Sequence, residues 1–130
     1  MRSLGIPEIA LALTLVSCAT TVPSSTAKFP PALREKIREL GGPNVKACGV
    51  VDVSNDADRS AKYECVRAAA GERKPFWLAD TQMASGGFGF AWIGSASGKI
   101  YQLLSFGSGP LATECRAFKV THDKGIHCSI

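Results

Sequence analysis

The order of apolar and polar residues changes several times along the chain, and each change predicts a different kind of segment. Near the N-terminus, Arg2 precedes an apolar run, Ile9–Val16, which lacks a polar face and is followed by small residues. This layout is typical of a secretory signal. The run is too short to span a bilayer, which requires about 20 apolar residues. The pattern therefore predicts an export segment rather than a membrane span or a buried helix.

Two later segments have the periodicity of helices. In residues 31–40, Leu33, Ile37 and Leu40 recur at helical spacing, and the glycines and proline at 41–43 end the pattern. Residues 57–70 form the second predicted helix, which Gly71 ends. One of its faces collects small residues and a cysteine: Ala57, Ala61, Cys65, Ala68 and Ala69.

Shorter segments, rich in β-branched and aromatic residues and separated by glycine-containing turns, predict strands. They are residues 46–53, 76–83, 88–94, 99–106, 114–121 and 126–130. Together these elements predict an α+β fold with two helices packed on an antiparallel sheet of four to five strands. The chain length suits one domain, which we expect to occupy residues 29–130.

The turns between the central strands define an expected register, in which Ala79 faces Trp92 and Trp92 faces Tyr101. Alternation along the strands then divides the sheet into two faces. One face collects Trp77, Met83, Phe88, Phe90, Trp92, Tyr101 and Leu103. The other collects Phe76, Leu78, Gly89, Ala91, Ile93, Ile100, Leu104 and Phe106. We expect the alanine-rich helix on this second face, because Gly89 and Ala91 leave room for it.

The aromatic face has two interpretations. In the first, helix 31–40 covers it and the aromatic residues are core, which is the more common role of such stripes. In the second, part of the stripe is a surface for a partner or ligand, since Trp and Tyr are enriched in such surfaces. The residues of this candidate partner surface are Trp77, Phe90, Trp92 and Tyr101.

The distribution of charge argues against a nucleic-acid partner. The net charge is +4, and the basic residues are scattered along the sequence. Nucleic-acid binding requires basic residues clustered on a face or along a helix. We therefore expect no nucleic-acid partner.

The residues that end the export segment, Leu15-Val16-Ser17-Cys18, resemble the lipobox of bacterial lipoproteins. The resemblance implies that the lipoprotein processing machinery removes residues 1–17 as a signal peptide and attaches diacylglycerol to the Cys18 sulfur. A further acyl chain on the new amino group, such as palmitate, would complete a stable membrane anchor. Ala19 resembles the members sorted to the outer membrane, which implies a position on its periplasmic face. Residues 18–28, rich in Ser and Thr, are then a flexible tether close to the membrane.

Four cysteines remain for the folded part: Cys48, Cys65, Cys115 and Cys128. An even number in a small exported domain predicts two disulfides, and three pairings are open. We expect Cys48–Cys65 and Cys115–Cys128, because each pair is close in sequence and brackets a two-element unit. The alternative is a zinc site of Cys115, His122, His127 and Cys128, but this set lacks the usual C-x-x-C half. We therefore expect no metal site.

The sequence offers no recognisable catalytic motif. Gly94–Gly98 has Ala96 where a nucleophile elbow carries its nucleophile, and Gly98-Lys99 lacks the other residues of a phosphate loop. Asp80, predicted to lie within a strand, is a lone acid. We expect no catalytic residues and no cofactor.

Residues 46–128 also resemble small disulfide-containing bacterial lipoproteins and exported proteins that have no established activity. The matching residues are Cys48-Gly49, Cys65, Lys74-Pro75-Phe76, Gly98-Lys99-Ile100-Tyr101, Cys115 and Cys128. This resemblance supports the disulfide framework and implies no chemistry. The leading hypothesis is a non-enzymatic, membrane-tethered module that binds an envelope protein or has a structural role in the envelope. The alternative is a small envelope hydrolase whose site the sequence does not identify.

Overall fold

The structure, a computed structural model, describes residues 29–106, 109–121 and 125–130. The elements in chain order are α3 (Pro31–Lys36), the π-helical η2 (Ile37–Gly41), β1 (Lys46–Val51), α4 (Asp56–Gly71), β2 (Phe76–Asp80), α5 (Thr81–Ala84), β3 (Phe90–Gly94), β4 (Ile100–Phe106), β5 (Gly109–Glu114), β6 (Ala117–Thr121) and β7 (Gly125–Ser129). The expected signal peptide, Cys18 and the tether lie outside the described residues.

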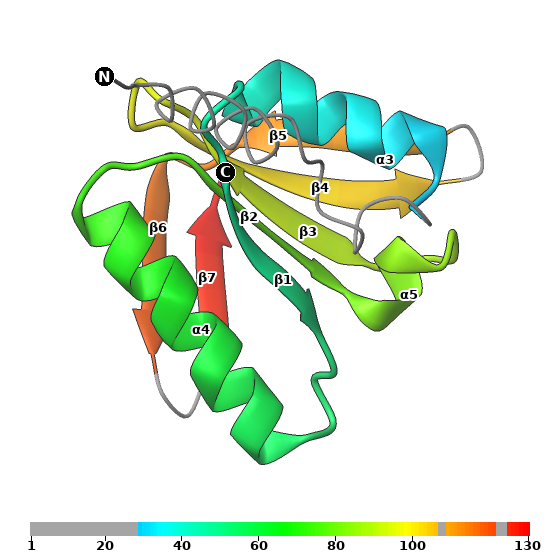
Figure 1. The fold of residues 1–130 in the computed structure, drawn as a ribbon, viewed down its shortest axis with the longest axis horizontal. Coiled ribbons are helices and arrows are strands. Elements are labelled where there is room, and N and C mark those ends of the chain that lie inside the picture. Colours follow the sequence, from blue (N-terminus) through cyan, green and yellow to red (C-terminus); the bar gives the residue numbers. More distant parts are fainter. Residues whose placement is uncertain (1–28, 107–108, 122–124) are drawn as a thin grey trace, which may run out of the picture.

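These elements form three layers (Figure 1). The middle layer is a five-stranded sheet in the order β1-β2-β3-β4-β5. Helix α3 and its continuation η2 lie on one face, and α4 lies on the other together with the β6–β7 hairpin. The mixture of helices and sheet agrees with the expected fold class.

The sheet is not wholly antiparallel, which corrects the prediction at one pair of strands. β1 and β2 run parallel, whereas the other three pairings are antiparallel. The cause is the connection between them, because α4 carries the chain back along the sheet before β2 begins. Such a crossover is the usual way to join neighbouring parallel strands.

The first hydrophobic core lies between the sheet and α3 with η2. Leu33 and Ile37 are buried there, and Leu40 packs beside them against the cluster that contains Trp77. The Phe29 ring meets Trp77 edge-on, with ring centroids 5.2 Å apart and planes at 84°. Helix 31–40 therefore covers this face through the three residues that its periodicity indicated.

The second core lies between the sheet and α4 with the β6–β7 hairpin. Three residues of α4 are buried in it: Tyr63, Val66 and Ala69. They pack with Phe76, Leu78 and Trp92 of the sheet and with Phe118, Val120 and Ile126 of the hairpin. The face predicted for this helix was wrong in part, since Ala57, Ala61 and Ala68 are exposed. The side that carries Tyr63 and Val66 is buried instead, because it removes more apolar area from water.

Both expected disulfides are present. Cys48–Cys65 joins β1 to α4, and Cys115–Cys128 joins the residue after β5 to β7. A bulge helps to place Cys48, because Ala47 pairs with Trp77 while Gly49 already pairs with the next residue of β2. Cys48 and Val51 consequently both belong to the α4 core, although regular alternation would separate residues three apart.

The register of the first hairpin differs by one residue from the prediction. Leu78 pairs with Trp92, where Ala79 was expected. The strand prediction for residues 76–83 was too long, because β2 ends at Asp80 and α5 follows. The Asp80 carboxylate accepts a hydrogen bond from the Met83 N–H at 2.8 Å, which caps α5 and ends the strand.

The second hairpin differs by one residue as well, since Trp92 pairs with Gln102 and not with Tyr101. The Ser95 N–H donates to the Lys99 carbonyl at 2.8 Å, and Gly98 has a φ of +88°. The loop therefore has three residues with glycine in the left-handed region, rather than the symmetric four-residue turn that was expected. The two register shifts compensate each other, so the side chains of β4 lie on the predicted faces relative to β2. Only the side chains of β3 lie on the faces opposite to those predicted.

Candidate functional site

The four residues of the expected partner surface do not share a face of the sheet. Trp77 and Tyr101 belong to the first hydrophobic core, between the sheet and α3, where Trp77 is 2% exposed. Phe90 and Trp92 lie on the α4 side, where Trp92 is 8% exposed. The reversal of β3 is the reason, since a shift of one residue moves every side chain of a strand to the other face. The prediction of one surface formed by Trp77, Phe90, Trp92 and Tyr101 was therefore wrong.

A different group of apolar side chains lies near α5, and we call it the apolar patch: exposed Phe88, Phe90 and Leu111, with half-buried Leu104. Phe90 of β3 pairs with Leu104 of β4, which pairs with Leu111 of β5, so these three form a row across neighbouring strands. Phe88 lies two residues before Phe90. The exposed fractions are 71% for Phe88, 45% for Phe90 and 56% for Leu111. Of the five large apolar residues exposed in the described chain, two therefore lie in one row and a third lies in the adjoining loop, and grouped apolar residues mark interaction surfaces.

Trp92 forms the boundary between the apolar patch and the core. Its ring stacks on the Phe90 ring, with centroids 6.1 Å apart and planes at 12°. On its other side Trp92 packs in the cluster under α4. Helix α4 and the hairpin thus cover the sheet as far as Trp92 and leave the row of Phe90 exposed.

The loop that carries Phe88 is held by Asp80. The Asp80 carboxylate accepts hydrogen bonds from the N–H groups of Met83 at 2.8 Å and Phe90 at 3.2 Å, one near each end of the loop. Gly89 lies so close that a Cβ atom there would overlap this carboxylate. Phe88 is therefore presented by a loop with a defined conformation.

The apolar patch belongs to a sparsely charged part of the sequence. Between Asp80 and Lys99 there is no charged residue, and there is none between Lys99 and Glu114. These stretches contain all four residues of the patch. Contacts made by the patch will therefore depend on apolar area far more than on charge.

The described chain begins beside the apolar patch. A Cβ atom on Gly86 would lie 3.7 Å from the Cγ atom of Pro30, so Pro30 is in contact with the loop that presents Phe88. Helix α3 starts at the end of the sheet where α5 lies (Figure 1). The described chain therefore begins at the end of the sheet that carries the patch, although Phe29 packs on the α3 side and Phe90 lies on the α4 side.

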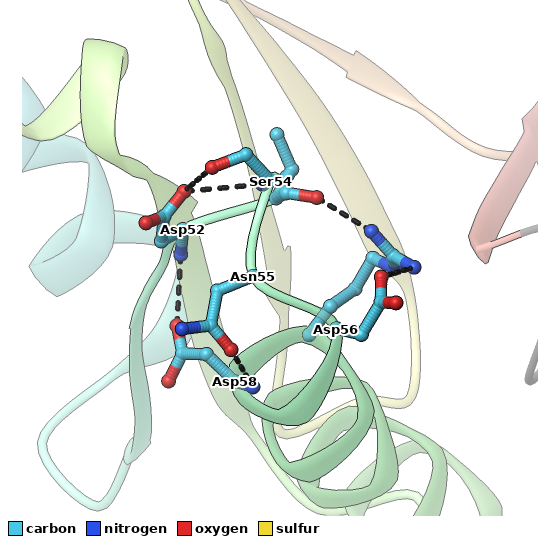
Figure 2. Close-up of polar contacts among 7 residues, drawn as sticks. Asp52, Ser54, Asn55, Asp56 and Asp58 are labelled. Atoms are coloured by element: carbon cyan, nitrogen blue, oxygen red, sulfur yellow. Dashed lines mark hydrogen bonds and ion pairs between the residues drawn. The ribbon is translucent and has the colours of Figure 1, made fainter.

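A polar cluster at the start of α4 has a structural explanation. Figure 2 shows these side chains in the turn between β1 and α4. The Asn55 side chain accepts the Asp58 N–H at 2.9 Å, and the Ser54 hydroxyl donates to Asp52 at 2.6 Å. The Asp58 carboxylate accepts from Lys62 at 2.6 Å and from the Asp52 N–H at 2.8 Å. Chiefly through Lys62, these bonds hold the pKa of Asp58 below its ordinary value of 3.8. The cluster therefore caps the helix.

Two cavities in the described part of the chain are small. One lies between α4 and β6 and includes Tyr63, and the other lies beside the turn at Gly98. Each has a volume of about 10 Å³, which is the room for one water molecule. Pockets for small organic ligands are usually about 300 Å³ or larger. Neither cavity identifies an organic substrate.

Two residues of the alternative zinc set, Cys115 and Cys128, are bonded to each other. As a disulfide they cannot serve as thiolate ligands. His127 is exposed on β7, and His122 lies outside the described residues. Among the residues that the structure describes, no three His, Cys, Asp or Glu side chains are grouped as metal ligands.

Comparison with known protein families, curated proteins and solved structures finds no match to this chain. None of the described helices has both the length and the apolar character needed to cross a bilayer. The apolar patch therefore stands as the candidate site on its geometry alone.

Proposed function

We propose that this chain is an exported bacterial lipoprotein whose folded part is a non-enzymatic module of the cell envelope. Residues 1–17 are removed, and diacylglycerol on Cys18 anchors the mature protein. The tether of residues 18–28 then holds the domain near the membrane. Ala19 favours the outer membrane, with the domain on its periplasmic side.

The observation that carries this proposal is the division of the five cysteines. Four of them form two disulfides with one another. Cys18 is the fifth, so no cysteine of the chain is left to pair with it. It is also the cysteine that ends the lipobox-like sequence Leu15-Val16-Ser17-Cys18. Disulfides persist in oxidising compartments and are rare in the cytosol, which supports export.

The apolar patch supports a binding role for the domain. Exposed apolar area of this kind is typical of surfaces that meet a protein or a membrane. A role in binding an envelope component, or in the structure of the envelope, needs such a surface and no catalytic group.

Mass spectrometry of the processed protein tests the anchor. The full chain would be produced in a bacterium that has the lipoprotein processing enzymes. We expect a mature N-terminus at Cys18 that carries diacylglycerol and an acyl chain. Cys18→Ala is the matched control, and it should remain uncleaved and without lipid while both disulfides still form. A mature protein with a free thiol at position 18 would refute the proposal.

A further inference from the structure

We infer that the apolar patch docks the domain onto the bilayer that holds its anchor, with the Phe88 and Phe90 rings in the interfacial layer. This inference rests on the proposed lipid at Cys18. It names the lipid surface as the envelope component that the module binds.

The described chain enters the fold near the loop that carries Phe88. Pro30 lies next to Gly86 of that loop, so the described chain begins at the end of the sheet where the apolar patch lies. Residues 18–28 can reach at most about 40 Å, because a residue spans about 3.5 Å when fully extended. A lipid at Cys18 would therefore keep this end of the sheet within about 40 Å of the membrane.

Because the domain is already tethered to the membrane, even a surface with weak membrane affinity is enough to hold it there. A short tether raises the effective concentration of a linked site to the order of millimolar. A few exposed apolar side chains can then hold the domain on the membrane, although they would bind a membrane poorly from free solution. Phe88 at 71%, Leu111 at 56% and Phe90 at 45% exposure provide that area.

The chemistry of the patch favours the interfacial layer over a charged partner. Aromatic rings concentrate where a membrane meets water. Inserting a charge is expensive, and the sequence between Asp80 and Lys99 contains none. The Asp80 carboxylate, which holds the loop of Phe88, is already bonded to two backbone N–H groups of the loop. These two bonds offset part of the cost of bringing the Asp80 charge close to lipid.

A tryptophan placed in the patch can report this contact in the full, processed protein. Phe88→Trp would be reconstituted in phosphatidylcholine vesicles whose acyl chains carry bromine, which quenches tryptophan emission on contact. Ile130→Trp is the matched control, because Ile130 is 61% exposed and the adjacent Ser129 pairs with Ala117 of the hairpin, away from the patch. The wild-type signal of Trp77 and Trp92 would be subtracted from both.

We expect bromine to lower the emission from position 88 about twofold or more, since interfacial side chains lie roughly 5–10 Å deep, and to leave position 130 unchanged. The quenching should persist in about 1 M salt, where the Debye length is about 3 Å. Equal quenching at both positions, or none at position 88, would overturn the inference. So would emission from position 88 that shifts to the blue with protein concentration when no vesicles are present, because a second copy would then cover the patch.

The same preparation separates this inference from the proposed function. Mass spectrometry of the vesicle-bound protein shows whether Cys18 carries lipid. An acylated protein without quenching at position 88 refutes docking and leaves the anchor intact. A protein without lipid at Cys18 refutes the anchor, whatever the fluorescence shows.

Discussion

Removal of each disulfide tests how strongly the crosslinks stabilise a domain of this size. Cys48–Cys65 has a sequence separation of 17, and Cys115–Cys128 has one of 13. In the chain-entropy account, loops of this length contribute about 3 kcal/mol each. The two values differ by only about 0.2 kcal/mol, because loop length enters as a logarithm. Since whole domains are stable by about 5–15 kcal/mol, either loss would be a large fraction of the total.

The surroundings of the two bridges do not alter this expectation. Each has one buried cysteine, Cys48 in one bridge and Cys115 in the other, and one partner that is less buried. Replacement of both cysteines of a bridge by alanine should therefore remove similar packing contacts in the two cases. We expect each double variant to lose about 3 kcal/mol of unfolding free energy.

Urea unfolding of Cys48→Ala/Cys65→Ala and of Cys115→Ala/Cys128→Ala, beside the wild type, measures these losses. The slope of free energy against urea should also rise, because an unfolded chain without the crosslink exposes more surface. Wild-type protein treated with a thiol reductant is the control, and it should fall below both variants. A loss under about 1 kcal/mol, or a difference between the variants above about 1 kcal/mol, would refute the chain-entropy reasoning for this domain.

Two further predictions concern packing and pH. Gly94→Ala should destabilise the domain by about 1–3 kcal/mol in urea unfolding, because the new Cβ atom would overlap the buried Phe76 ring. Gly71→Ala is the control, since a Cβ atom there meets open space, and its stability should be unchanged or slightly higher. The hydrogen bond from Lys62 lowers the pKa of Asp58 below 3.8, so its stabilising contribution is complete above that pH and is lost as the pH falls through the lower folded value. Asp58→Asn should therefore lose less stability than the wild type on acidification below pH 3.8. An equal acid slope for both proteins would contradict this role.

Much of the fold could be predicted from local patterns. The stripe of Leu33, Ile37 and Leu40 identified a helix and its buried side, since only one side of that segment is apolar. The disulfide pairs and most strands could be found because close cysteines and turns are local signals, but β5 (Gly109–Glu114) was missed, since its glycine and proline are typical of a loop. The parallel pairing of β1 and β2 follows from the helix between them, and this consequence of the element order was missed.

The faces of the helix at residues 56–71 could not be read reliably from the sequence. Alanines occur on several of its sides, so small residues alone do not distinguish the buried one. Tyr63 and Val66 are the better signal, because they carry more apolar area. Gly98 was likewise a usable signal for a three-residue hairpin loop with a left-handed glycine.

The apolar patch could not be predicted because the alternation of residues does not show which side of β3 faces α3. β3 has apolar residues on both sides, so either Ala91 with Ile93 or Phe90 with Trp92 satisfies a period of two on the α3 side.

Core volume resolves that choice. The α3 side already holds the rings of Phe29 and Trp77, and small Ala91 fits beside them with 1% exposure. A Trp92 ring in that place would overfill the core, and overfilled cores are destabilised by about 1–3 kcal/mol. Trp92 therefore packs under α4, and Phe90, two residues before it on the same side, extends past the helix into solvent. The exposed surface is thus a consequence of filling the opposite core, and for this reason it could be identified only from the folded chain.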